Sequence, residues 1–194
     1  MNSAKTKRLL VGALLILAGV LCSGSNTRLI AQKQSAADKP WRELISSEGR
    51  FSVLLPGIPS EMFVPVPGQI VSTEMRVFAI KTSVAVYAVT YSDFPNDAEP
   101  EELKAAFDNG RDRALTEDKL QLISEKDVSA PGIIGREYVM DNGAFVIRNR
   151  VYYNQGRLYQ AIFSGPVLNG MPPGLVQYYD GLAAKFFKSF KIGS

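Results

Sequence analysis

The acidic residues between Asp93 and Glu102 are the first group in this sequence whose type and spacing suit a chemical role. Asp93, Asp97 and Glu99 supply carboxylate oxygens, which are ligands that Ca²⁺ prefers. Their spacing differs from that of an EF-hand loop, and no glycine in the stretch provides that loop's sharp turn. The segment therefore predicts either a metal site or a loop before a helix whose first turn carries favourable negative charge.

A second candidate consists of four polar residues on three predicted strands. We expect Asn142-Gly143 to form a two-residue hairpin turn, because this pair is the strongest such signal. That turn places Glu137 opposite Arg148. A three-residue loop at Asn154–Gly156 places Arg150 opposite Gln160.

Strand alternation then collects Glu137, Arg148, Arg150 and Gln160 on one face. We predict that the other face forms the core; its residues are Ile134, Tyr138, Met140, Phe145, Ile147, Val151, Tyr159 and Phe163. The polar face suits an anion, a carboxylate or a protein partner. The alternative interpretation is a solvated face with a Glu137–Arg148 ion pair, typically worth under ~1 kcal/mol.

Missing residue types exclude most catalytic chemistry. The sequence contains no histidine, and its single cysteine is Cys22. Beyond that position the chain therefore lacks the residues for nucleophilic catalysis by histidine or cysteine. It also lacks the usual ligands of zinc, copper, haem and iron–sulfur sites. Glycine-rich phosphate loops and serine nucleophile elbows are also absent from the sequence. We predict a protein that is not an enzyme and that has no catalytic residue or cofactor.

The first 25 residues have the pattern of a secretory signal. Lys5, Lys7 and Arg8 precede an apolar run from Leu9 to Leu21, which is shorter than the roughly 20 residues of a membrane-spanning helix. We expect a cleaved signal peptide, with a retained N-terminal anchor as the alternative. Lipidation of Cys22 is a third interpretation, although Leu21 stands where a lipidation signal prefers a small residue.

The chain beyond this leader is neutral and long enough to fold. The leader's three basic residues account for the formal net charge of +3. A neutral domain argues against nucleic acid and against membrane contact other than through the leader. Residues 26–40 are rich in Gln, Ser, Ala and Lys and predict a flexible tether. Residues 41–194 are sufficient for one domain with its own core.

Short strands and two helices are expected in that domain. Pro100 begins one helix, with acidic residues around its first turn, and Pro173–Lys188 has apolar residues at helical spacing. The predicted strands are Phe51–Leu55, Glu61–Val66, Val71–Ala79, Val84–Tyr91, Leu120–Ile123, Ile133–Met140, Ala144–Tyr153, Leu158–Phe163 and Ser189–Ile192. This order predicts an α+β fold: a twisted, mainly antiparallel sheet with helices packed on it.

Several short motifs occur in an order that resembles a known family. They are Gly49-Arg-Phe-Ser-Val53, Leu55-Pro56 with Pro59, Tyr87–Pro95, Gly135-Arg-Glu137, Arg157–Gln160 and Lys188-Ser-Phe190. Over Trp41–Ile192 the chain resembles bacterial exported domains with the PsbP/Mog1-like fold. The resemblance implies a sandwich fold and brings no catalytic motif. Plant proteins of this fold are accessory proteins of the photosynthetic water-oxidising complex, and another branch binds a nuclear-transport GTPase.

These observations predict an exported, non-enzymatic accessory or binding domain. Its expected place is the periplasm or the extracellular space, with anchoring to the inner membrane by the N-terminal segment as a variant. Its expected partner is a protein of the cell envelope. The alternative is a module that binds a small ligand or Ca²⁺ through the acidic loop or the arginine-bearing face.

Overall fold

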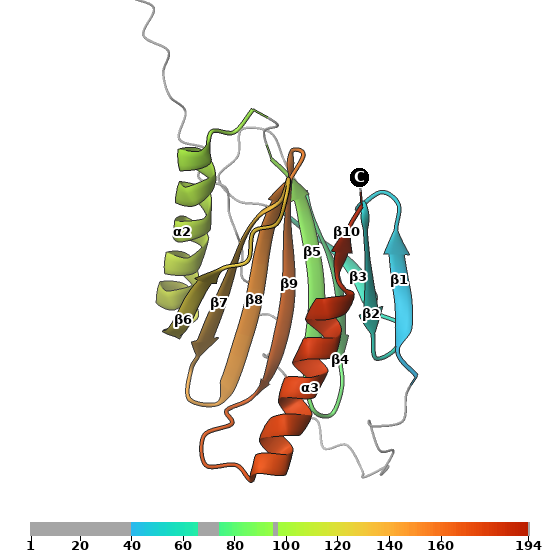
Figure 1. Ribbon diagram of the computed structural model, residues 1–194, viewed down its shortest axis with the longest axis vertical. Helices are drawn as coiled ribbons and strands as arrows, with labels where there is room; N and C mark the ends of the chain where they lie inside the picture. Colours follow the sequence, from blue (N-terminus) through green and yellow to red (C-terminus); the bar gives the residue numbers. More distant parts are fainter. Residues whose placement is uncertain (1–39, 66–73, 95–96, 194) are drawn as a thin grey trace, which may run out of the picture.

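The computed structural model describes residues 40–65, 74–94 and 97–193. The leader with Cys22, and the tether up to Lys39, lie outside the described residues. The described part forms two helices, α2 (Pro100–Glu117) and α3 (Pro173–Ser189) (Figure 1). Its strands are β1 (Arg42–Ser46), β2 (Phe51–Leu55), β3 (Ser60–Pro65), β4 (Glu74–Lys81), β5 (Val86–Asp93), β6 (Gln121–Asp127), β7 (Ile134–Asp141), β8 (Phe145–Asn154), β9 (Arg157–Pro166) and β10 (Lys191–Ile192).

Seven strands form an antiparallel sheet in the order β3-β4-β5-β9-β8-β7-β6. β5 is buried over most of its length, as its nearly continuous apolar sequence predicts for a strand covered on both faces. β3 lies at one edge, which suits a strand that ends at Pro65, because proline cannot donate a ladder hydrogen bond. The α+β class with a mainly antiparallel sheet is therefore confirmed.

The remaining strands form a second, three-stranded sheet in the order β1-β2-β10. β2 pairs with β1 along its whole length and with β10 through Lys191, which lies opposite Ser52. The backbone N–H of Gly193 extends this contact by donating to the carbonyl of Arg50 at 2.7 Å. The first and last strands of the described domain therefore flank the same strand.

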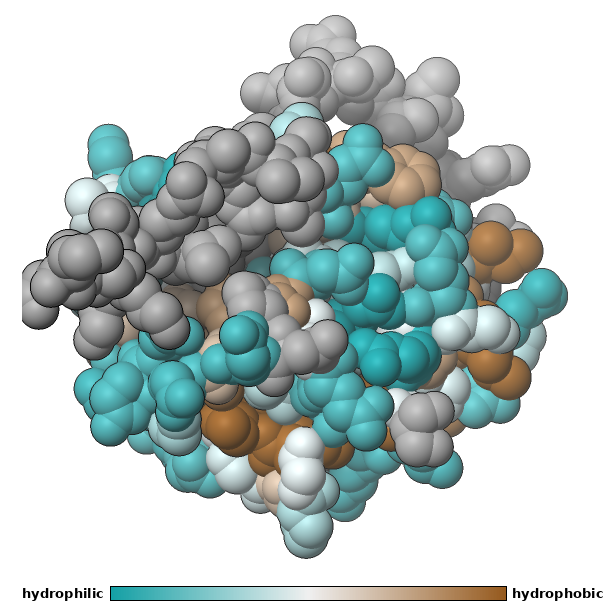
Figure 2. Space-filling model, turned by 90° about the horizontal axis from the view of Figure 1, so that it is seen from above, coloured by the Kyte–Doolittle hydropathy of each residue, from teal (hydrophilic) through white to brown (hydrophobic). Residues whose placement is uncertain are grey.

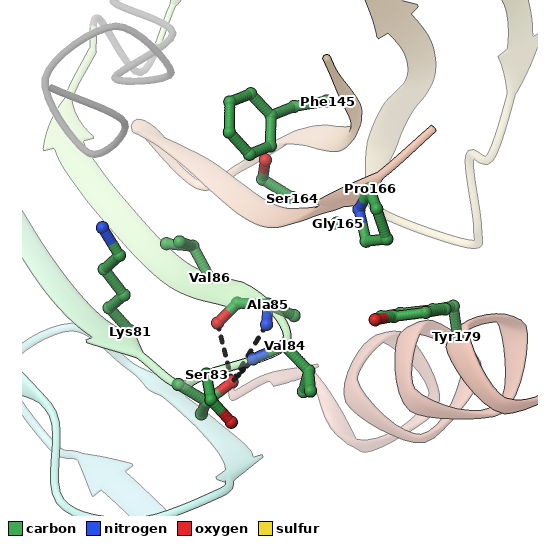
Figure 3. A pocket seen from close by; sticks show the side chains of 11 residues that line it. Lys81, Ser83, Val84, Ala85, Val86, Phe145, Ser164, Gly165, Pro166 and Tyr179 are labelled. Carbon is green, nitrogen blue, oxygen red and sulfur yellow. Dashed lines mark hydrogen bonds between the residues drawn. The ribbon is translucent and has the colours of Figure 1, made fainter. Parts of the chain in front are cut away.

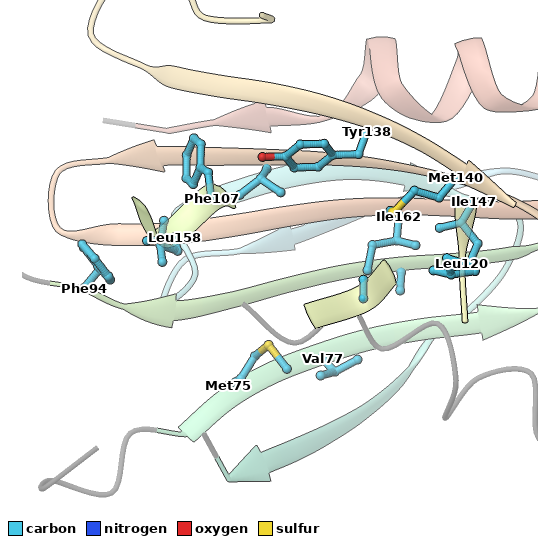
Figure 4. Packing of buried hydrophobic residues seen from close by; sticks show 14 of the residues in the cluster. Met75, Val77, Phe94, Phe107, Leu120, Tyr138, Met140, Ile147, Leu158 and Ile162 are labelled. Carbon is cyan, nitrogen blue, oxygen red and sulfur yellow. The ribbon is translucent and has the colours of Figure 1, made fainter. Parts of the chain in front are cut away.

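The two helices cover opposite faces of the seven-stranded sheet. Met75, Val77, Tyr138, Met140 and Ile162 point from one face into a core that includes Phe107 of α2 (Figure 4). α3 and the small sheet cover the other face, as Figure 1 shows. The core on that side includes Phe51, Val53, Leu55, Tyr87, Val89, Tyr159, Phe163, Ala183 and Phe186.

Both helices occur where the sequence predicts them. α2 starts at Pro100, and its first turn is capped because the Glu102 carboxylate accepts from the backbone N–H of Glu99 at 3.2 Å. It continues through Gly110, although glycine lowers helix propensity, and this residue is buried within the helix. α3 runs one residue beyond the predicted Lys188. No helix in the described ranges is both long and apolar enough to span a membrane.

The loop between β7 and β8 is longer than the predicted two-residue turn. Asp141 pairs with Val146, so four residues separate the paired positions. The side-chain oxygen of Asn142 accepts from the backbone N–H groups of Ala144 and Phe145, at 3.1 and 3.0 Å. This asparagine turn satisfies two backbone donors and stabilises the longer loop.

The longer loop changes one predicted pair. Glu137 lies opposite Arg150, and the prediction that it lies opposite Arg148 is wrong. Because the shift is two residues, strand alternation is preserved, and these three side chains still belong to one face.

The loop between β8 and β9 is shorter than predicted. Asn154 pairs with Arg157 across a two-residue turn, in which Gln155 has φ 42° and Gly156 has φ 72°. Positive φ at both central positions is typical of the hairpin turn whose twist matches that of the flanking strands.

This one-residue difference moves every side chain of β9 to the other face. Gln160 lies opposite Val151, so the prediction that it shares a face with Arg150 is wrong. Tyr159 and Phe163 were expected in the core with Tyr138. They belong instead to the core beneath α3.

Candidate functional site

Glu137 and Arg150 form the centre of the predicted polar face. The Arg150 Nε donates to the Glu137 carboxylate at 2.5 Å, and the Lys126 ammonium lies 2.7 Å from the other carboxylate oxygen. Glu137 is only 6% exposed. The guanidinium of Arg150 also lies over the ring of Phe187 in α3, 4.5 Å from its centroid. The cluster therefore connects β6, β7 and β8 to the helix above them.

The electrostatics of this cluster favour an ionised Glu137. Burial alone acts to raise the pKa of Glu137, but hydrogen bonds from Lys126 and Arg150 outweigh burial and hold the pKa below its ordinary value. A carboxylate that is already paired with two cations does not act as a general base at neutral pH. Its chemical role is to hold the two basic side chains.

Arg148, the other arginine of this face, is also paired. Its Nη2 lies 2.5 Å from the Asp180 carboxylate of α3. The helix thus supplies partners to both arginines, a carboxylate for Arg148 and a ring for Arg150. The structure places Glu137, Arg148 and Arg150 together, but as the junction between the sheet and α3 and not as an open anion-binding surface.

Gln160 lies on the opposite face and is buried there. Its side-chain carbonyl accepts from the Asn149 amide at 3.0 Å. Asn149 is fully buried, and so is Tyr138, whose hydroxyl has no hydrogen-bond partner among the described residues. Burial raises the pKa of Tyr138 to about 12, so its hydroxyl stays protonated at neutral pH. These side chains form a polar row within the core beneath α2.

The acidic stretch is not assembled into a metal centre in the described part of the chain. Asp93 ends β5, where its carboxylate accepts from the Arg157 guanidinium at 2.7 and 2.9 Å. Glu99 precedes α2 and takes part in its capping. Among the residues that the structure describes, no three acidic side chains are grouped closely enough to hold a metal ion, and Asp97 joins no such group.

Asp93 and Arg157 belong to a charged end of the molecule. Arg157 also lies over the ring of Tyr91 at 4.6 Å and donates to the backbone carbonyl of Glu48. Arg50 donates to the carbonyl of Gln155 at 3.0 Å. Figure 2, which views the molecule from this end, shows hydrophilic side chains gathered over much of the described surface.

The opposite end carries a pocket that the sequence did not predict. Its walls come from the β4–β5 turn, the end of β9, Phe145 at the start of β8, and Tyr179 of α3 (Figure 3). Its volume is about 250 Å³. Sequence periodicity cannot place these segments together, because they lie far apart along the chain. The apolar run of β5 and the Gly165-Pro166 pair are the only local signals of its walls.

Exposed apolar side chains lie on the two elements, β8 and α3, that contribute Phe145 and Tyr179 to this pocket. Phe145 is 41% exposed, and on α3 Leu175 and Tyr178 are 47% and 37% exposed. Leu175 and Tyr178 lie one turn before Tyr179 and Leu182, which pack against the core. The apolar stripe of α3 thus extends beyond the sheet that it covers. We call these three exposed residues the apolar rim.

Comparisons with known proteins identify the fold. No protein-family model matches the chain, and no curated protein matches it. The solution structure of cyanobacterial PsbP from Synechocystis matches over 88% of this chain and 98% of its own, with 16% identity and a TM-score of 0.57. This likeness shows the PsbP/Mog1-like fold that the sequence motifs resembled.

Two other solved structures match less well. The Ran-binding protein Mog1p of Saccharomyces cerevisiae is 11% identical over 79% of this chain and 96% of its own, with a TM-score of 0.43. A Pseudomonas aeruginosa protein of unknown function, described as a putative regulator, is 11% identical over 74% of this chain and 90% of its own, with a TM-score of 0.37. Neither of these two likenesses supports a functional argument.

Proposed function

We propose that this chain is an exported, non-enzymatic binding or accessory domain that acts through a protein partner in the cell envelope. The leader pattern supports export, and the missing histidine, with Cys22 as the only cysteine, supports a role without catalysis. The observation that carries the proposal is the apolar rim, because its three side chains remain exposed on β8 and α3, two elements that contribute walls to the pocket.

The chemistry of the apolar rim suits a contact between proteins. Single exposed apolar residues are normal on soluble domains, but an aromatic group gathered beside a concave site is typical of the centre of an interface. The arginine face is less suited to this role, because Arg148 and Arg150 are already engaged by α3. The partner would therefore bury Phe145, Leu175 and Tyr178.

A pull-down of the affinity-tagged full chain from envelope fractions tests this proposal. We expect a stoichiometric protein partner, identified by mass spectrometry, that is lost when Leu175→Ser and Tyr178→Ser are combined. The melting temperature should stay within about 3 °C of wild type, because surface changes rarely exceed ±0.5 kcal/mol. The same spectra identify the N-terminus and show whether Cys22 is removed, lipidated or retained.

The matched control combines Ile45→Ser and Ile134→Ser, two exposed apolar positions on strands outside the rim. This variant should keep the partner. Retention of the partner by the Leu175/Tyr178 variant, or its loss in both variants, contradicts an interface at the apolar rim. A chain that purifies without any protein partner contradicts the proposal as a whole.

A further inference from the structure

The pocket described above is large enough for a small molecule. A volume of about 250 Å³ corresponds to roughly eight water-sized groups at about 30 Å³ each. Its walls are mainly apolar and come from the residues Val84, Ala85, Val86, Phe145, Gly165 and Pro166. An apolar body of that size, such as a short alkyl chain or one aromatic ring, would fill it.

The turn that forms one wall is held in shape by its own hydrogen bonds. The Thr82 hydroxyl donates to the carbonyl of Ala85 at 2.9 Å and accepts from its backbone N–H at 3.0 Å. A further bond joins the Thr82 backbone N–H to the same carbonyl at 2.9 Å. Thr82 is therefore fully engaged, and this wall is preformed before any ligand arrives.

The other four polar side chains of the lining are those of Lys81, Ser83, Ser164 and Tyr179, and none of them is engaged in this way. Lys81 makes no ion pair, and the hydroxyls of Ser164 and Tyr179 make no hydrogen bond, with any residue in the described ranges. Ser164 is only 6% exposed. In Figure 3 the Tyr179 hydroxyl points toward the β4–β5 turn, and Lys81 lies on the other side of that turn.

The charge of the polar side chains in the pocket indicates which kind of ligand they suit. Lys81 is the only charged residue among the described residues of the lining, which include no aspartate or glutamate. An ammonium and hydroxyls can all donate hydrogen bonds, so together they match a group that only accepts. A carboxylate meets that requirement and forms charge-assisted hydrogen bonds, which are about twice as strong as neutral ones.

We infer that this pocket binds a small carboxylate carried on an apolar group, with Lys81 as the residue that recognises the charge. The apolar group lies against Phe145 and Val86, and the carboxylate lies between Lys81 and the hydroxyl of Ser164, which pair with Val86 from its two sides. The inference goes beyond the proposed protein partner, because it assigns a ligand to the pocket and does not depend on what covers the apolar rim.

Ligand-observed ¹⁹F NMR with the purified full chain tests this inference. The probe is 4-fluorobenzoate, and its neutral counterpart is 4-fluorobenzamide, which has nearly the same shape and no charge. We expect 4-fluorobenzoate to bind at least tenfold more tightly than the amide to the wild-type protein. Non-fluorinated hexanoate should displace the probe if alkyl and aromatic bodies share the site.

Variants assign the binding to the pocket. Lys81→Gln should weaken 4-fluorobenzoate binding at least tenfold and leave the weak binding of the amide unchanged. The control is Lys191→Gln, which removes another exposed lysine, on β10, and should leave both affinities unchanged. Ser164→Ala removes one hydroxyl from the pocket and should weaken binding of the carboxylate only.

Two results would overturn the inference. One is that the wild-type protein binds 4-fluorobenzoate and 4-fluorobenzamide equally tightly, or binds neither at millimolar concentration. The other is unchanged 4-fluorobenzoate binding in Lys81→Gln, with folding of that variant verified by its thermal unfolding. A protein partner found by pull-down leaves these outcomes unaffected, so failure of the two proposals can be told apart.

Discussion

Glu137 is the residue whose surroundings explain most about the junction between sheet and helix. Its nearly buried carboxylate holds Arg150 in place, and Arg150 in turn packs its guanidinium on Phe187. A buried carboxylate is costly to desolvate, and here two cations offset that cost. Removing the negative charge would therefore break both ion pairs and loosen the contact of α3 with the sheet.

Glu137→Gln should destabilise the fold by roughly 1.5–3 kcal/mol at neutral pH, because hydrogen bonds to charged groups contribute about that much. Urea unfolding followed by the fluorescence of the single tryptophan measures this change. Glu43→Gln is the control, since Glu43 is exposed on β1 and forms no ion pair within the described residues. An equal effect of both substitutions would contradict the role given to Glu137.

The destabilisation should disappear in acid. The pKa of Glu137 is lowered in the folded protein, so its contribution is fully present above the ordinary glutamate pKa of about 4.3. It is lost as pH falls through the lowered folded value. Unfolding free energies measured from pH 7 to acid should therefore differ between wild type and Glu137→Gln above about pH 5, and this difference should shrink as the pH falls through the ordinary glutamate pKa and then through the lowered folded one. A difference that does not change with pH would contradict this.

At the scale of single residues, the sequence predicted part of the polar face. Alternation correctly grouped Glu137, Arg148 and Arg150, because a two-residue register shift leaves faces unchanged. It failed for Gln160, because a loop one residue shorter exchanges the faces. Asn154–Gly156 fits a two- or a three-residue loop, and the twist of the strands decides between them. The pocket was not predictable, since its lining depends on tertiary packing.

At the scale of the elements, both helices and most strands were predictable from local signals. α2 and α3 carry proline in the first turn and apolar residues at helical spacing, which are properties of the segment alone. β1 was not predicted, because Arg42–Ser46 is mainly polar and exposed and pairs only at one edge of β2. The three-stranded sheet depends on contacts between the two ends of the domain, and no local pattern reports them.

α3 combines a buried part and an exposed part, and one substitution in each separates their roles. Phe186 is fully buried against Tyr87, whereas Leu175 is 47% exposed. Phe186→Ala should therefore cost about 3–5 kcal/mol of stability. Leu175→Ala should change stability by less than about 0.5 kcal/mol. Chemical denaturation of both variants checks this, and comparable losses would show that the exposed part of α3 is structural.

For the whole molecule, β2 is the strand that joins the beginning of the domain to its end. β1 and β10 pair with its two edges, and the Ser189 hydroxyl of α3 accepts from the backbone N–H of Leu54 at 2.9 Å. β2 also contributes Phe51, Val53 and Leu55 to the core beneath α3. The small sheet is complete only when β10, from the end of the described domain, has paired with β2.

Deletion of residues 191–194 should destabilise the entire domain by roughly 1–3 kcal/mol, because a few backbone hydrogen bonds at about 0.5–1.5 kcal/mol each are lost. Phe190 is retained so that its ring contacts remain. Thermal unfolding should show one transition at a lower temperature, and deletion of Ser194 alone is the control. A separate early transition would mean that β1 and β2 unfold independently of the larger sheet.

Trp41 determines where the chain enters the domain. Its ring packs against Tyr87 at 5.5 Å and lies under the Lys185 ammonium, beside the start of β5, whose Val86 lines the pocket. If the leader stays in a bilayer, the fourteen residues from Asn26 to Lys39 reach at most roughly 50 Å. The domain would then stay within that distance of the membrane, attached at the end that carries its pocket. The molecules it meets first would be those concentrated near the membrane surface.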